Sequence, residues 1–169
     1  MKIGFIGLGK LGRDAAEVLN EKHDVVGYDP NITLEISGTQ EEACKGKDVV
    51  LIAVQTPHDP KYGGETPTSH LEPKDFDYSY LIQAVKDVDA LVDEGTLISV
   101  ISTVLPGTVR REVLPLIKRG KFIYNPYLIA QGTVKWDMRN PEMIMIGTES
   151  GKDDEQSQAL RKVYDPILQ

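Results

Sequence analysis

Short apolar runs alternate with amphipathic stretches along most of the chain. The apolar runs predict strands at residues 2–6, 24–28, 33–36, 49–54, 97–101, 122–124 and 143–146. The run Val-Val-Leu-Ile-Ala-Val at 49–54 is the strongest signal for a central strand, because strands covered on both faces are continuously apolar.

Helices are predicted between these strands. Leu11, Ala15, Val18 and Leu19 recur at helical spacing, and the other helices are expected at residues 40–45, 81–92, 107–118 and 160–164. Pro115 should end or bend the helix at 107–118. Strand–helix alternation of this kind predicts an α/β fold with a doubly wound, mostly parallel sheet and helices on both faces. Ligands of such sheets bind beyond the carboxyl ends of the strands.

A glycine-rich turn follows the first strand and opens the first helix. It reads Gly7-Leu8-Gly9-Lys10-Leu11-Gly12, which is the spacing of the dinucleotide-binding turn of a Rossmann fold. The first glycine permits the tight turn, the second lets the backbone approach a pyrophosphate, and the third lets helix and strand pack closely. The alternative is a glycine-rich turn without a ligand.

Asp29 ends the second predicted strand. A carboxylate at this place accepts hydrogen bonds from the adenosine ribose and repels a 2′-phosphate, so it favours NAD over NADP. A simpler role for Asp29, turn initiation before Pro30, is compatible with the first.

Composition narrows the class of protein. The 169 residues suit one domain, and the net charge of −7 disfavours nucleic-acid and anionic-membrane partners. No apolar run reaches the length of a membrane helix, and the N-terminus does not resemble a signal peptide, so the cytoplasm is the expected compartment. The one cysteine, Cys44, excludes an internal disulfide. The spacing of the histidines supports no metal site.

Residues 55–77 are expected to form a long loop, since they include four prolines and two adjacent glycines. A loop of this length within a compact domain is usually functional or disordered.

Three further stretches carry a family resemblance. They are Ile52-Ala53-Val54-Gln55-Thr56-Pro57, the stretch Ser102-Thr103-Val104-Leu105-Pro106-Gly107-Thr108, and the C-terminal third from Asn125-Pro126 to Met145-Ile146-Gly147. With the glycine turn, their order resembles the N-terminal domain of the UDP-glucose/GDP-mannose dehydrogenase family, whose members oxidise a sugar-nucleotide alcohol to a carboxylate in two NAD-dependent steps.

The resemblance implies roles for individual residues. Val54, Thr56 and Pro57 would line the adenosine side of the cofactor. Ser102 and Thr103 would stand near the nicotinamide, with the Thr103 hydroxyl ordering a water or the reacting oxygen. The other interpretation of Thr103 is a hydroxyl that caps its own helix.

The departures from the family pattern are equally informative. Tyr127 and Gln131 replace the two glutamates of the family's Pro-Glu-Phe-Leu-x-Glu-Gly stretch. Gln131 can still bind a nicotinamide carboxamide, whereas Tyr127 is a poor general base at neutral pH. Residues 1–169 would form a single dinucleotide-binding domain, and the family's central helix and C-terminal sugar-nucleotide domain have no counterpart in the sequence. The segment between Asp29 and Gly38 is shorter than in typical members of the family, and the loop around residues 62–65 is longer than in those members.

Three hypotheses follow. The first is the NAD-binding domain of a nucleotide-sugar dehydrogenase, incomplete for catalysis unless another segment or a partner chain supplies the rest. The second, prompted by the loss of both glutamates, is a stand-alone NAD(H)-binding module without hydride transfer. The third is a different class that shares the glycine turn, such as the β-hydroxyacid dehydrogenases, and the stretch at 102–108 argues against it. Beside NAD(H), the expected partners are a sugar nucleotide and a second copy of the chain in a homodimer.

Overall fold

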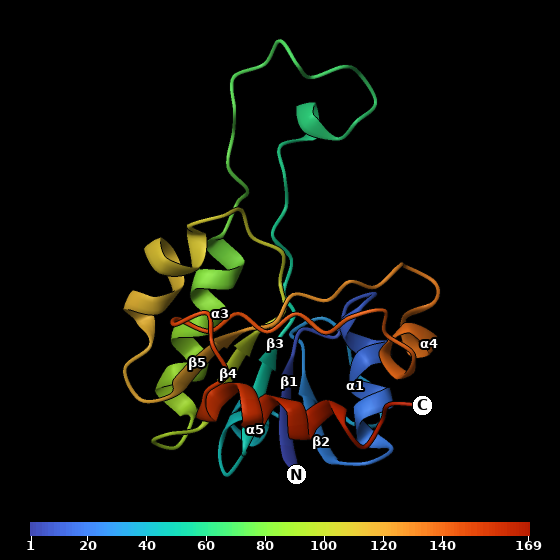
Figure 1. The fold of residues 1–169 in the computed structure, drawn as a ribbon, viewed down its shortest axis with the longest axis vertical. Coiled ribbons are helices and arrows are strands. Elements are labelled where there is room, and N and C mark those ends of the chain that lie inside the picture. The colour runs from blue at the N-terminus through green and yellow to red at the C-terminus, as the bar shows by residue number, and fades with distance from the viewer.

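A computed structural model describes residues 1–169 and contains one sheet of five parallel strands (Figure 1). The strands are β1 (Lys2–Ile6), β2 (Asp24–Tyr28), β3 (Val49–Ile52), β4 (Leu97–Val100) and β5 (Lys121–Tyr124). Their order in the sheet is β2-β1-β3-β4-β5, so β2 lies on one side of β1 and the later strands lie on the other. The strand order therefore reverses between β1 and β3. The predicted Rossmann-type sheet is confirmed, and the reversal marks the place where such sheets bind ligands.

Helices cover both faces of the sheet. They are α1 (Gly12–Asn20), α2 (Gln40–Cys44), α3 (Ser79–Leu91), α4 (Val134–Arg139) and α5 (Glu155–Tyr164). The apolar sides of α1, α4 and α5 pack in one core cluster, whereas α2 and α3 pack in a second cluster on the opposite face. Figure 1 shows α5 lying across the strands. No helix of this structure combines the length and apolar character needed to cross a membrane.

The predicted helix at 107–118 is broken, as the proline suggested. A π-helical turn, Val109–Val113, runs directly into a 3₁₀ turn, Leu114–Leu116, that contains Pro115. The chain then turns into β5, where the buried carboxylate of Asp89 from α3 accepts hydrogen bonds from the backbone N–H groups of residues 118–120. This carboxylate provides the acceptors for three backbone N–H groups of the turn before β5.

Two predicted strands are wrong. At 33–36 the Ser37 hydroxyl accepts the N–H of Leu34 and the Ser37 N–H donates to the Leu34 carbonyl, so the backbone turns and keeps only an isolated bridge to Gly27. At 143–146 the carbonyl of Met145 accepts the side-chain amide of Asn125 in place of a ladder bond. Gly147 alone bridges β5 in this segment. The helix α4 was not predicted.

The segment 55–77 is irregular, as predicted, and holds only the 3₁₀ turn Pro60–Tyr62. It leaves the sheet after β3 and projects well clear of the rest of the molecule (Figure 1, top). Its two limbs are joined by the bond from the Asp77 N–H to the Pro57 carbonyl (2.8 Å) and by the ion pair of Lys74 with Asp59 (2.6 Å).

Ser99 gives a stability test of the packing. Its hydroxyl is fully buried in β4 and has no hydrogen-bond partner. We expect Ser99→Ala to raise the free energy of unfolding by about 1 kcal/mol, because the unpaired buried hydroxyl is removed. Urea unfolding followed by circular dichroism measures the change.

Ser157 is the matched control for this substitution. It is equally buried, but its hydroxyl accepts the Asp154 N–H (2.8 Å) in the capping box of α5. Ser157→Ala should therefore lower the free energy of unfolding by about 1 kcal/mol. An equal loss of stability in both variants would mean that Ser99 has a partner after all.

Candidate functional site

The glycine turn joins β1 to α1 with a different demand at each glycine. Gly7 has φ +95, a conformation that strains other residues, and a Cβ on Gly12 would lie 1.9 Å from the Gly7 carbonyl oxygen. A Cβ on Gly9 would meet nothing within 4 Å. The fold thus requires glycine at positions 7 and 12, whereas Gly9 faces open space.

Backbone donors are left free in this turn. The N–H groups of Gly9, Lys10 and Leu11 donate no hydrogen bond within the chain, and no side chain caps the start of α1 at Leu11. The helix dipole adds a partial positive charge at the same place, and the Lys10 side chain is exposed beside it. The turn is therefore a cradle for an anion such as a pyrophosphate.

Asp29 connects the end of β2 to this turn. One carboxylate oxygen accepts the Leu8 N–H (2.9 Å), and the other accepts the Asn31 N–H (2.9 Å). The second bond is the turn contact expected before Pro30. The side chain remains partly exposed, so its remaining lone pairs are available to ribose hydroxyls.

A cleft of about 460 Å³ opens at the ends of β1, β2 and β3, beside Asp29 and Gly9. Val54 lines it, but Thr56 and Pro57 do not. Instead, the Thr56 hydroxyl donates to the Thr103 carbonyl (2.7 Å) and the Ser102 hydroxyl donates to the Val54 carbonyl (2.6 Å). These two bonds hold the carboxyl ends of β3 and β4 together.

Thr103 and Gln131 both carry exposed side chains without a hydrogen-bond partner. Thr103 does not cap a helix, because the next helical turn begins only after Thr108. Gln131 lies in the turn before α4, next to Gly132 with φ +100. Their proposed contacts with a nicotinamide stay predictions.

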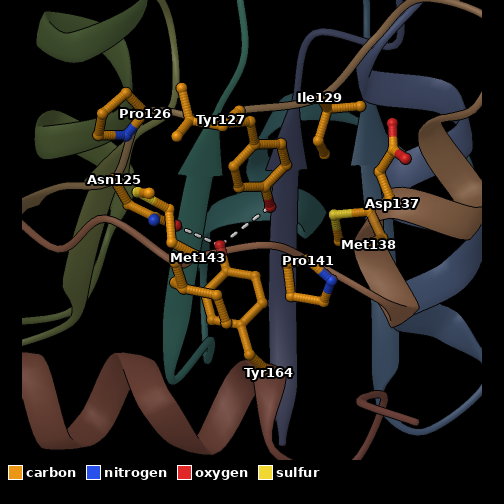
Figure 2. A pocket seen from close by; sticks show the side chains of 11 residues that line it. Asn125, Pro126, Tyr127, Ile129, Asp137, Met138, Pro141, Met143 and Tyr164 are labelled. Atoms are coloured by element: carbon orange, nitrogen blue, oxygen red, sulfur yellow. Dashed lines mark hydrogen bonds between the residues drawn. The ribbon is translucent and has the colours of Figure 1, made fainter.

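Tyr127 has a different environment (Figure 2). Its phenol points inward and lies 3.0 Å, oxygen to oxygen, from the phenol of Tyr164, which also hydrogen-bonds the Asn125 side-chain oxygen. The two rings meet nearly edge to face, at 73°. Burial raises the pKa of both tyrosines well above the usual range, so both stay protonated at neutral pH.

The remaining reactive side chains do not extend this site. Cys44 lies buried in α2, where burial raises the pKa of its thiol to about 11. Nowhere in the chain do three His, Cys, Asp or Glu side chains converge in a metal-binding arrangement.

Comparison with known proteins identifies the family. A model of the NAD-binding domain of the UDP-glucose/GDP-mannose dehydrogenase family matches residues 30–168. The chain belongs to this family. Its cofactor is NAD, and the free N–H groups, the carboxylate and the cleft described above fit that cofactor. The glycine turn lies outside the matched range, so its role depends on its own geometry.

Individual relatives agree with this assignment. GDP-mannose 6-dehydrogenase of Pseudomonas putida is 27% identical over an alignment covering 99% of this chain and 45% of the relative. UDP-N-acetyl-D-mannosamine dehydrogenase of Pyrococcus horikoshii is 27% identical, covering 87% of this chain and 37% of the relative. A crystal structure of GDP-mannose dehydrogenase from Pseudomonas aeruginosa shares the fold, with a TM-score of 0.76 at 24% identity over 99% of this chain and 44% of that one. The chain thus spans less than half the length of these relatives.

The sequence prediction missed one wall of the cleft, which α3 provides through Tyr80, Gln83, Ala84 and Asp87. The spacing i, i+3, i+4, i+7 was the available signal, because it describes one helical face. The sequence prediction rested on the apolar positions of the same helix, which pack on the sheet.

Gly9 separates ligand binding from folding. We expect Gly9→Val to weaken NAD binding at least tenfold, about 1.4 kcal/mol, because the branched side chain fills the space that the pyrophosphate needs. The melting temperature should stay close to that of the wild type, since the added Cβ meets no atom. Gly12→Ala is the contrasting variant and should destabilise the fold. Unchanged NAD affinity in Gly9→Val, measured by calorimetry, would remove the turn from the site.

Asp29 should set the choice of cofactor. We expect NAD to bind at least tenfold tighter than NADP, about 1.4 kcal/mol, because the carboxylate repels a 2′-phosphate. Asp29→Asn should bring the ratio of the NAD affinity to the NADP affinity closer to one. Asp24→Asn, at the exposed start of the same strand, should leave it unchanged. Equal affinities of the wild type for the two cofactors would contradict the assignment.

Proposed function

We propose that this chain is the cofactor-binding domain of a nucleotide-sugar dehydrogenase and that, alone, it binds NAD(H) without oxidising a sugar nucleotide. The observation that carries the proposal is the inward position of Tyr127, whose phenol is engaged with Tyr164. The resemblance to the family places a glutamate at this position. NAD, when bound, supplies the acceptor for a hydride, and the residues of this chain only bind and orient it.

The binding roles follow from the geometry around the cleft. The free N–H groups of Gly9, Lys10 and Leu11 would hold the pyrophosphate, and the Asp29 carboxylate would accept hydrogen bonds from the ribose hydroxyls. Val54 would provide an apolar surface for the adenosine. Lys10 would add a positive charge near the phosphates.

Orientation at the nicotinamide end would fall to Thr103 and Gln131. Both are exposed, and a hydroxyl and an amide can hydrogen-bond a carboxamide or a water. Neither group can accept the proton that an alcohol must lose during oxidation at neutral pH. The proton acceptor would have to come from another polypeptide segment or from a partner chain.

Oxidation to the acid needs a nucleophile as well. Cys44 is the only thiol of the chain, and its burial and raised pKa keep it protonated and inaccessible. The sugar nucleotide and the nucleophile would therefore be bound by the part that the relatives carry in the rest of their length. A homodimer of this chain would not by itself add either group.

The inward Tyr127 also favours a second candidate function, a stand-alone NAD(H)-binding module without hydride transfer. The two candidates differ in their need for a second polypeptide. A cell extract that lacks this chain should gain sugar-nucleotide dehydrogenase activity on its addition under the first proposal, and should gain none under the second.

The proposal predicts binding without turnover. In one preparation, calorimetry should detect NAD binding, whereas UDP-glucose and GDP-mannose should yield no NADH above background. A full-length GDP-mannose 6-dehydrogenase serves as the positive control for the NADH absorbance assay. Steady NADH formation by this chain alone would show that the glutamates and the second half are dispensable. A failure to bind NAD would overturn the cofactor-binding role itself.

A further inference from the structure

The segment that carries Thr103 has little regular structure of its own. Residues 103–107 follow β4 and belong to no helix or strand. Two side-chain hydroxyls bond to their backbone. The Thr56 hydroxyl donates to the Thr103 carbonyl (2.7 Å), and the Leu105 N–H donates to the Tyr78 hydroxyl (3.1 Å). The position of Thr103 therefore depends on side chains from another part of the chain.

Tyr78 makes the larger share of these contacts. Its side chain is buried, and its hydroxyl donates to Asp75 Oδ1 (2.5 Å) while it accepts the Leu105 N–H and the Thr108 hydroxyl (3.2 Å). The bond from Tyr78 lowers the pKa of Asp75, so this carboxyl group is ionised at neutral pH and can only accept. With one donated and two accepted bonds, the Tyr78 hydroxyl is fully engaged.

Both ends of the projecting segment 55–77 thus meet the segment that carries Thr103. Thr56 lies where the projecting segment leaves the sheet, and Asp75 lies where it returns to α3. Arg111 of the π-helical turn also donates to Asp75 Oδ2 (2.9 Å). These contacts join the base of the projecting segment to the residues on either side of the Thr103 backbone.

We propose that Tyr78 is a positioning residue for the nicotinamide end of the cofactor: it fixes the backbone two residues beyond Thr103, so that the Thr103 hydroxyl is presented to the nicotinamide. The inference rests on the proposed binding of NAD(H). The Thr103 side chain is exposed and has no hydrogen-bond partner, so its orientation comes from the backbone that carries it. The glycine turn and Asp29, which would hold the pyrophosphate and the adenosine ribose, make no hydrogen bond with Tyr78. Loss of the Tyr78 hydroxyl should therefore affect only the nicotinamide end.

The test compares NADH with ADP-ribose, which has the adenosine, the pyrophosphate and the second ribose of NADH but no nicotinamide. The wild type should bind NADH about fivefold tighter than ADP-ribose, as one additional hydrogen bond allows. Tyr78→Phe keeps the ring and removes the hydroxyl, so this ratio should fall to about one while the affinity for ADP-ribose stays unchanged. Tyr62→Phe is the matched control and should keep the wild-type ratio, because the Tyr62 hydroxyl bonds the Glu72 carbonyl within the projecting segment.

Asp75→Ala is a second variant, at an exposed side chain whose loss should leave the fold intact. It removes the acceptor that orients the Tyr78 hydroxyl and should lower the ratio about twofold. Calorimetry gives both affinities without any enzymatic turnover. An unchanged ratio in either variant, an equal fall of both affinities in Tyr78→Phe, or equal wild-type affinity for NADH and ADP-ribose would overturn the positioning role. If the wild type binds neither ligand, the proposed function is refuted instead.

Discussion

The candidate site depends most on one hydrogen bond, which the Leu8 N–H donates to the Asp29 carboxylate. It ties the end of β2 to the glycine turn after β1, at the point where the sheet order reverses. The Gly7 N–H donates to the Tyr28 carbonyl (2.9 Å) and the Leu8 N–H to the Asp29 carboxylate, whereas the N–H groups of Gly9, Lys10 and Leu11 donate no hydrogen bond within the chain. Gly7 and Gly12 fix the shape of the turn, which we expect to receive a pyrophosphate, with a ribose at Asp29.

A second constraint is the hydrogen-bond network around Tyr127. The segment after β5 is anchored to α5 by hydrogen bonds between Tyr127, Tyr164 and Asn125, and the Asn125 amide also holds Met145 (Figure 2). The Asn125 side chain and the two protonated phenols form a hydrogen-bonded network in a mostly apolar crevice. This network anchors the segment after β5 and engages the Tyr127 phenol with Tyr164.

The sequence predicted the parallel sheet and the glycine turn because both depend on local patterns. Continuous apolar runs such as 49–54 and the spacing of three glycines need no knowledge of distant residues. The wrong strand at 33–36 has a local cause, the turn between Leu34 and Ser37, whereas the other errors have non-local causes. Residues 143–146 are apolar enough for a strand, but the side chain of Asn125 takes the Met145 carbonyl. The inward phenol of Tyr127 depends on Tyr164, which lies 37 residues away. The helical spacing of Tyr80, Gln83, Ala84 and Asp87 is visible in the sequence, but only the fold shows that this side of α3 lines the cleft.

The most direct test of the account is a crystal structure of this chain with NAD bound. We expect the pyrophosphate against the N–H groups of Gly9, Lys10 and Leu11 and a ribose on Asp29, with the phenol of Tyr127 still bonded to Tyr164. A cofactor bound elsewhere would contradict the role of the turn. A Tyr127 side chain swung out toward the nicotinamide would contradict the claim that this domain holds its cofactor without supplying the proton acceptor.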